Sequence, residues 1–202
     1  MEDSHHILKY LSNTIPAASE LFPEEIAKGE IDALCARFDS ILGPAVRMVV
    51  YFHCLDLPSV GAAFVVGAPQ AERDALSRPG ALNKLRGGLR RALGIDAAAA
   101  AKSVSDINAI FGVVGDRLLS NTTPLFLVGD RFTAADLTFA ALAAPVLELP
   151  YGGWALDDVG CELPCEFADL VARLRNTPAG RHAVRLWAEE RPVCRVSGPA
   201  RL

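Results

Sequence analysis

Apolar residues recur three or four positions apart along most of this chain, which is the spacing that gives a helix one buried face. The competing prediction is a strand for residues 46–52, VRMVVYF, because β-branched residues are enriched there. Since helical spacing continues directly upstream and no strand–turn–helix alternation is present, we expect an all-α fold. The predicted helices cover residues 3–13, 24–57, 82–93, 103–120, 133–144, 167–174 and 178–191.

Proline, glycine and capping residues predict where these helices begin, bend and end. Residues 16–23, PAASELFP, are expected to form a connecting loop. Pro44 lacks an amide hydrogen and clashes with the preceding helical turn, so we expect a kink or a break there. Gly94 suits a helix C-cap, and Ser103 with Asp106 fits a capping box at the start of a helix.

Composition and charge exclude several classes of protein. Hydrophobic residues make up 51% and charged residues 22% of the 202 residues, which is the balance of a globular core. With a net charge of -4, the chain lacks the basic field of a nucleic-acid-binding protein. Its polar first residues do not resemble a signal peptide, and its apolar runs are too short to span a membrane. We therefore expect a soluble cytoplasmic protein that binds neither nucleic acid nor membrane.

Cysteine and histidine residues form no recognisable catalytic or metal-binding motif. The five cysteines are scattered, and Cys161 and Cys165, the only close pair, lack the second pair that a zinc site needs. The four histidines do not belong to a visible Ser-His-Asp or Cys-His arrangement. His5 and His6 are expected at the surface. We predict no metal site and no bound cofactor.

A basic cluster in the middle of the chain admits two interpretations. The first is a solvated helix face, which is the usual place for such charges. The alternative is a contact surface for an anionic partner or ligand. The cluster consists of Lys84, Arg86, Arg90 and Arg91.

Residues 125–142, LFLVGDRFTAADLTFAAL, carry the most specific pattern in the chain. Thr133 fits a helix N-cap, and Asp136 at the third helical position can bond back to the Thr133 amide. Phe132 and Leu137 are placed as a hydrophobic staple across this cap. Several alanines keep the following helix thin enough to pass through the middle of a bundle. We therefore interpret Thr133 and Asp136 as a structural capping box and not as catalysts.

This segment closely resembles the capped core helix of the glutathione transferase family. Looser similarity extends to FDSILGPAVR at residues 38–47 and to RNTPAG at residues 175–180. The resemblance implies an all-α glutathione transferase C-terminal-domain-like helical bundle. The implied organisation is a remnant last helix of a thioredoxin-like domain at 1–15, a linker at 16–23, the helical domain at 24–192 and an irregular tail at 193–202.

The resemblance also implies where glutathione would bind. In the family, an acidic residue followed by Ser opens that last helix and binds the γ-glutamyl end of glutathione, and Asp3 and Ser4 match this pair. A hydroxyl and free amides at a helix N-terminus can hold a carboxylate. Arg47, Tyr51 and Phe111 are candidates to line a hydrophobic-substrate pocket. No residue is assigned a catalytic role, because the thiolate-activating part of the family's thioredoxin-like domain has no counterpart in this chain.

The resulting hypothesis is a glutathione transferase relative that is weak or inactive on its own. The parent activity is conjugation of the glutathione thiolate to an apolar electrophile, with glutathione as co-substrate. Whether this chain is itself an enzyme stays open. We expect a homodimer, or a partner that covers the apolar face left by the missing domain. Two alternatives also stay open: a non-catalytic protein–protein interaction module and a carrier of apolar ligands.

Overall fold

Every regular element of the described chain is helical. The structure, a computed structural model, describes residues 4–23, 28–58, 60, 68–120, 125–150 and 162–191. The α-helices are α1 (Ser4–Thr14), α2 (Lys28–Arg37), α3 (Gly43–Cys54), α5 (Gln70–Leu76), α6 (Ala81–Leu93), α7 (Ala97–Ser120), α8 (Ala134–Ala143), α9 (Cys165–Arg175) and α10 (Pro178–Glu189). The 3₁₀ helices η1 (Pro16–Leu21) and η3 (Ala144–Leu147) and the π-helix η2 (Phe38–Leu42) complete the set. The all-α prediction is confirmed. Residues 46–52, for which a strand was the competing prediction, are part of helix α3.

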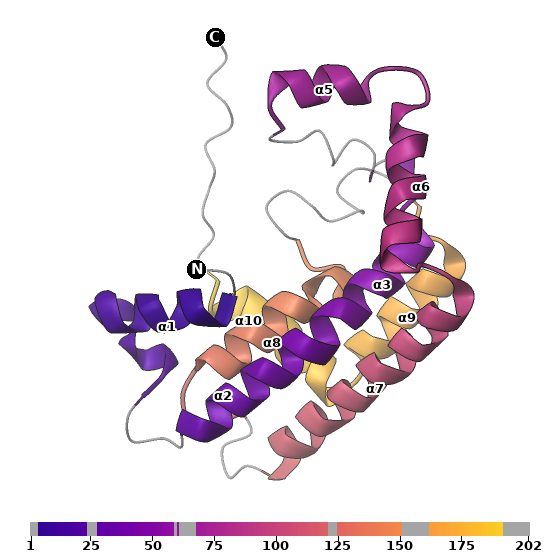
Figure 1. The fold of residues 1–202 in the computed structure, drawn as a ribbon. Helices are drawn as coiled ribbons and strands as arrows, with labels where there is room; N and C mark the ends of the chain where they lie inside the picture. Colours follow the sequence, from indigo (N-terminus) through magenta and orange to yellow (C-terminus); the bar gives the residue numbers. More distant parts are fainter. Residues whose placement is uncertain are drawn as a thin grey trace.

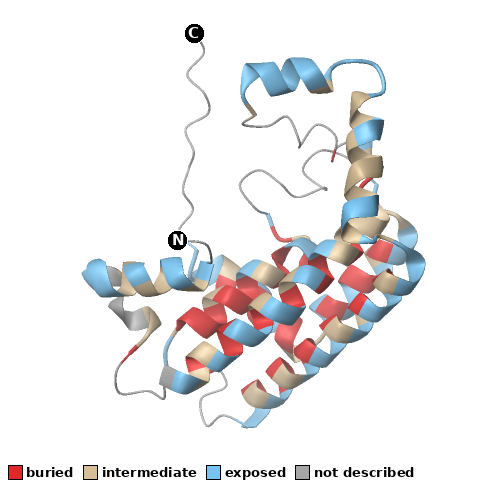
Figure 2. Ribbon diagram, viewed as in Figure 1, coloured by how far each residue is buried: buried red, intermediate tan, exposed pale blue. Residues whose placement is uncertain are grey.

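A bundle of α2, α3, α7, α8, α9 and α10 forms the body of the molecule, and α8 lies at its centre (Figure 1). Seven of the ten residues of α8 are buried. Its Phe139 ring lies 5.4 Å from the rings of both Phe38 and Phe111, which come from η2 and α7. Buried residues concentrate in this bundle and are sparse outside it (Figure 2). A thin, alanine-rich helix therefore occupies the position that brings the other helices together.

Helices α2, η2 and α3 follow one another without an intervening loop, and Pro44 lies at the start of α3. In η2 the turn widens, and the Gly43 amide donates to the Phe38 carbonyl five residues earlier. Pro44 then lies in the first turn of α3, where its missing amide hydrogen leaves no helical bond unmade. The predicted irregularity is present, and a π-turn takes the place of a break.

The start of α7 corrects the predicted capping box at Ser103 and Asp106. Asp96 accepts a hydrogen bond from the Ala99 amide at 2.8 Å, so the helix already begins at Ala97. Ser103 is buried inside the helix and caps nothing. The alanines before it are the best helix formers and simply extend α7.

The length and composition of α7 bear on the expectation that the apolar runs are too short to span a membrane. By length and composition alone, this 24-residue helix could cross one. Its buried residues, among them Ile107, Ile110 and Val114, belong to the core of the bundle. The helix packs there against α3 and α10.

Helix α1 and η1 form an arm beside α2 (Figure 1). The helix predicted at residues 3–13 is present as α1, but part of the predicted loop at 16–23 forms η1. No residue of α1 is buried. Leu8 of the arm packs, partly buried, against the core, and polar contacts join the arm to α2, including a 3.0 Å bond from the Lys9 ammonium to the Asp32 carboxylate.

Helices α5 and α6 form a second appendage at the other end of the bundle (Figure 1). Gly94 ends α6 in the left-handed conformation at φ 62°, as predicted for a C-cap. Two members of the basic cluster attach α6 to the end of α3. Arg86 donates to the Leu57 carbonyl at 3.0 Å, and Arg90 pairs with Asp56 at 2.6 Å. No residue of either helix is buried.

Candidate functional site

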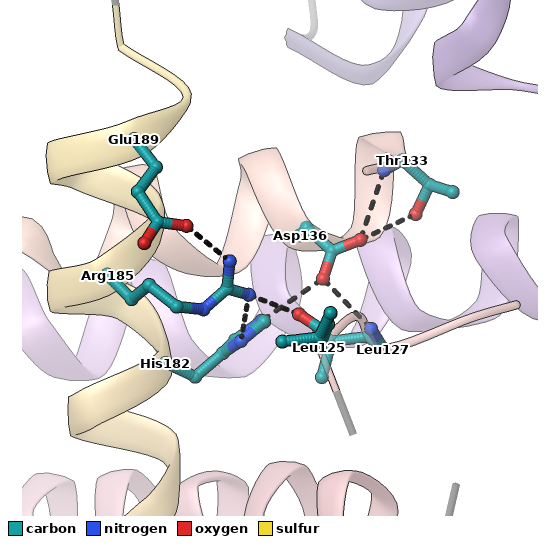
Figure 3. Close-up of polar contacts among 7 residues, drawn as sticks. All are labelled: Leu125, Leu127, Thr133, Asp136, His182, Arg185 and Glu189. Carbon is teal, nitrogen blue, oxygen red and sulfur yellow. Dashed lines mark hydrogen bonds and ion pairs between the residues drawn. The ribbon is translucent and has the colours of Figure 1, made fainter. Parts of the chain in front are cut away.

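The Asp136 carboxylate is the centre of a buried polar cluster at the start of α8 (Figure 3). Thr133 has extended backbone and forms the predicted capping box with Asp136. Asp136 Oδ2 accepts from the Thr133 amide and from its hydroxyl, both at 3.0 Å. Both residues are fully buried, so this cap lies in the core and not at the surface of the protein. The predicted structural role of the pair fits this geometry.

The other oxygen of Asp136 reaches two segments outside α8. Oδ1 accepts from the Leu127 amide at 2.9 Å, which fixes the loop that leads into the helix. The same oxygen lies 3.1 Å from Nε2 of His182 on α10. His182 is also buried. One carboxylate thus joins the loop, the start of α8 and α10, and its charge is compensated by several donors.

Arg185 continues the cluster from the buried histidine to the surface (Figure 3). One guanidinium nitrogen lies 3.4 Å from Nδ1 of His182 and also donates to the Leu125 carbonyl. The other terminal nitrogen donates to Glu189 at 2.8 Å, one turn along α10. The guanidinium lies 5.4 Å from the centre of the Phe126 ring, a cation–π distance. The loop before α8 is therefore held to α10 by side-chain and main-chain contacts.

A buried Asp–His pair also occurs in catalytic triads, where the second imidazole nitrogen faces a nucleophile. Here that nitrogen faces Arg185. Because a guanidinium only donates, Nδ1 accepts and Nε2 carries the hydrogen toward Asp136; this tautomer is assigned from the contacts. Both ring nitrogens are engaged in holding the structure together. We interpret the cluster as a structural centre.

A cavity of about 350 Å³ lies on the outer side of the same two helices, α8 and α10. Its apolar lining comes from the capping segment and both helices, and Glu190 and Arg191 contribute the charged groups. Phe132 and Leu137, the predicted staple pair, both line it. The lining residues are Phe132, Leu137, Ala140, Ala141, Leu186, Trp187, Glu190 and Arg191.

The side chain of Trp187 in this cavity is fixed by contacts on α10 and with the chain after η3. Its indole nitrogen donates to the Pro150 carbonyl at 3.0 Å. The Arg191 guanidinium lies 4.5 Å from the centre of the indole ring and also donates to Pro150, at 3.3 Å. These contacts fix the orientation of the aromatic wall of the cavity.

The residues predicted to bind substrates are not brought together in one site. Asp3 lies outside the described residues, and the hydroxyl of exposed Ser4 lies 3.5 Å from the Asp39 carboxylate. Phe111 is buried in the core against Phe139, whereas Arg47 is exposed on α3 and Tyr51 is half-buried. None of these residues lines the cavity between α8 and α10.

Burial shifts the pKa of two other reactive side chains, Cys35 and His53. Burial raises the pKa of the Cys35 thiol to about 11, while a hydrogen bond from Thr138 opposes this shift. A thiol with this pKa is not ionised near neutral pH and is a poor nucleophile. Burial likewise lowers the pKa of His53, against the opposing effect of the Glu166 carboxylate. Among the described residues no group of three or more side chains could hold a metal ion.

Sequence patterns did not reveal the surroundings of three residues, His182, His5 and Trp187. His182 pairs with a residue 46 positions away, and the sequence gives only a weak signal: a histidine on the apolar face of a predicted helix. His5, predicted at the surface, is partly buried and lies 3.2 Å from Asp32. Trp187, which lines the cavity between α8 and α10, is in the sequence only one of the apolar positions of the predicted last helix.

Comparison with known protein families, with curated proteins and with solved structures found no match to this chain.

Proposed function

We propose that this chain is a glutathione transferase relative in which residues 24–192 form the C-terminal helical domain. The observation that supports this proposal is the buried capping box of Thr133 and Asp136 at the start of the central helix. A capped, alanine-rich helix through the middle of an all-helical bundle is what the resemblance implies. In the proposed parent reaction, the thiolate of glutathione attacks an apolar electrophile.

We expect the isolated chain to have little or no conjugating activity. Thiol transfer needs a donor that stabilises the thiolate, and no described residue is assigned that role. The surroundings of Ser4 also work against glutathione binding. The Ser4 hydroxyl lies beside the Asp39 carboxylate, which would repel the carboxylate of an incoming glutathione.

An assay with glutathione and an aryl halide tests this proposal directly. The isolated chain should give a rate indistinguishable from the uncatalysed reaction, while an active glutathione transferase in parallel confirms the assay. Robust turnover that is saturable in glutathione would overturn the expectation of inactivity. A second experiment tests the proposed family relationship. If that relationship is correct, a fusion of the chain to a thioredoxin-like domain should bind glutathione.

A second candidate function is a non-catalytic interaction module, which exposed apolar side chains favour. Ile7 and Tyr10 on α1 are 43% and 54% exposed, and Leu119 at the end of α7 is 75% exposed. Ile7 and Tyr10 lie one helical turn apart on the same face of α1, and adjacent exposed apolar side chains are the feature that marks a surface for pairing with another protein. On this proposal the chain would form a homodimer or a complex with a helical partner.

Light scattering coupled to size exclusion distinguishes these states. We expect a dimer or a larger species at concentrations of about 100 μM, because only a weak interface is required there. Replacing Tyr10 by Ser should shift the equilibrium toward monomer if α1 is part of the contact. A monomer at all concentrations would count against self-association and leave a heterologous partner as the remaining form of this proposal.

A further inference from the structure

We propose that the cavity between α8 and α10 binds an uncharged aromatic small molecule. This site is separate from the predicted glutathione site at Asp3 and Ser4, and it goes beyond the function proposed above. It is also distinct from the predicted pocket at Arg47, Tyr51 and Phe111, none of which contributes to it.

The size of the cavity fits a small organic molecule. A volume of about 350 Å³ lies within the range of about 300–1,000 Å³ that is typical of ligand pockets. An apolar cavity of about 150 Å³ is already large enough for benzene. A molecule with about two aromatic rings would therefore fill most of this space.

The sequence of α8 explains why this cavity forms. Leu137 and Ala141 lie on the side of α8 that the bundle does not cover, so this helix is apolar on both its inner and its outer face. Ala140 and Ala141 are small, and the larger side chains of Phe132 and Trp187 stand beside them. Small residues on a helix bordered by rings leave room that an apolar ligand can fill.

The chemistry of the lining favours an uncharged aromatic ligand. Trp187 and Phe132 offer ring surfaces, and aromatic pairs gain stabilisation beyond the area that they bury. The indole N–H is committed to the Pro150 carbonyl, so it does not select a polar ligand group. Glu190 and Arg191 in the lining carry opposite charges, so the net charge of the lining favours neither an anion nor a cation.

Titration with the uncharged fluorescent dye N-phenylnaphthylamine tests this proposal without glutathione. We expect a saturable increase in dye emission with one dye per chain, together with a rise in melting temperature. Because no glutathione is present, the result is independent of the conjugation assay. Absence of saturable binding, or binding of many dyes per chain, would overturn the proposal.

Two matched variants locate the binding site. Ala141 and Ala101 are both exposed residues on helices, but only Ala141 lines the cavity. Ala141→Phe should fill the space and weaken dye binding about tenfold or more, whereas Ala101→Phe should bind as the parent does. Circular dichroism of both variants verifies that the helices remain. Equal dye affinity in the two variants would place the dye elsewhere and contradict the proposal.

Discussion

The helices around α8 and the two appendages are held in place by different kinds of contact. Seven residues of α8 are buried, and the Asp136 carboxylate joins this helix to α10 and to the preceding loop. In α1, α5 and α6 no residue is buried, and the polar contacts of α1 and α6 with the bundle involve partly or fully exposed side chains. Figure 2 shows the same division, with buried residues confined largely to the bundle.

This difference shows what helical periodicity does and does not reveal. Apolar stripes predicted both α6 and α10, yet only α10 contributes residues to the core. Exposed ion pairs contribute little to stability, whereas a buried carboxylate that loses its donors is costly. We therefore expect substitutions in the bundle to change global stability and substitutions in the appendages to act locally.

The largest effect should come from Gly180→Ala in the first turn of α10. A methyl group there would lie 2.0 Å from the Leu174 carbonyl oxygen, and the atoms that block it are backbone. Helix α10 would have to move away from the end of α9, so we expect a loss of about 4 kcal/mol or more in the free energy of unfolding. Urea denaturation followed by circular dichroism measures this loss.

Gly88→Ala in α6 is the matched control for that substitution. No atom lies within 4 Å of a methyl group placed there, so the only change is the higher helix propensity of alanine. We expect the variant to be as stable as the parent or slightly more stable. A Gly180→Ala protein that unfolds with the parent's midpoint would refute close packing between α9 and α10.

The next largest effect should come from Asp136→Asn. An amide is similar in shape but cannot accept all the hydrogen bonds from Leu127, Thr133 and His182, so buried donors are left unsatisfied. We expect a loss of about 3 kcal/mol in the free energy of unfolding, measured by urea denaturation. Asp106→Asn removes an exposed pair with Lys102 and should cost only about 0.5 kcal/mol. Equal losses in the two variants would show that burial of the Asp136 cluster does not matter.

A smaller effect than that of Asp136→Asn should come from Asp32→Asn, which weakens the contacts of Asp32 on α2 with His5 and Lys9 on α1. The Asp32 side chain is 37% exposed, so we expect a change of about 1 kcal/mol or less in global stability. The amides of α1 should exchange faster with deuterium, while those of α8 keep the parent rates. A matching acceleration in α8 would mean that the arm and the bundle unfold together.

The local patterns in the sequence predicted much of the bundle. Thr133 and Asp136 are three residues apart, so their capping box follows from the order of residues alone. The positions of Pro44 and Gly94 likewise indicated the irregular turn at η2 and the end of α6. These features depend on backbone chemistry within one or two helical turns.

Contacts between distant residues could not be predicted in this way. Nothing near Asp136 in the sequence identifies His182 as its partner, because the pairing depends on how α10 packs against α8. The cavity beside Trp187 likewise arises where α8 meets α10, and the distant carbonyl of Pro150 orients its indole ring. The start of α7 was predicted wrongly for another reason. Ser103 and Asp106 have the spacing of a capping box, but the side chain that accepts a hydrogen bond at the start of the helix is Asp96.

Hydrogen exchange at the Leu127 amide tests the central claim, that the buried Asp136 cluster holds the bundle together. This amide belongs to no helix, and its hydrogen bond is to Asp136 Oδ1 at 2.9 Å. We predict that it exchanges as slowly as the core amides of α8, through global unfolding, and that Asp136→Asn removes this protection. Exchange of Leu127 at the rate of the α1 amides in the parent protein would contradict the claim.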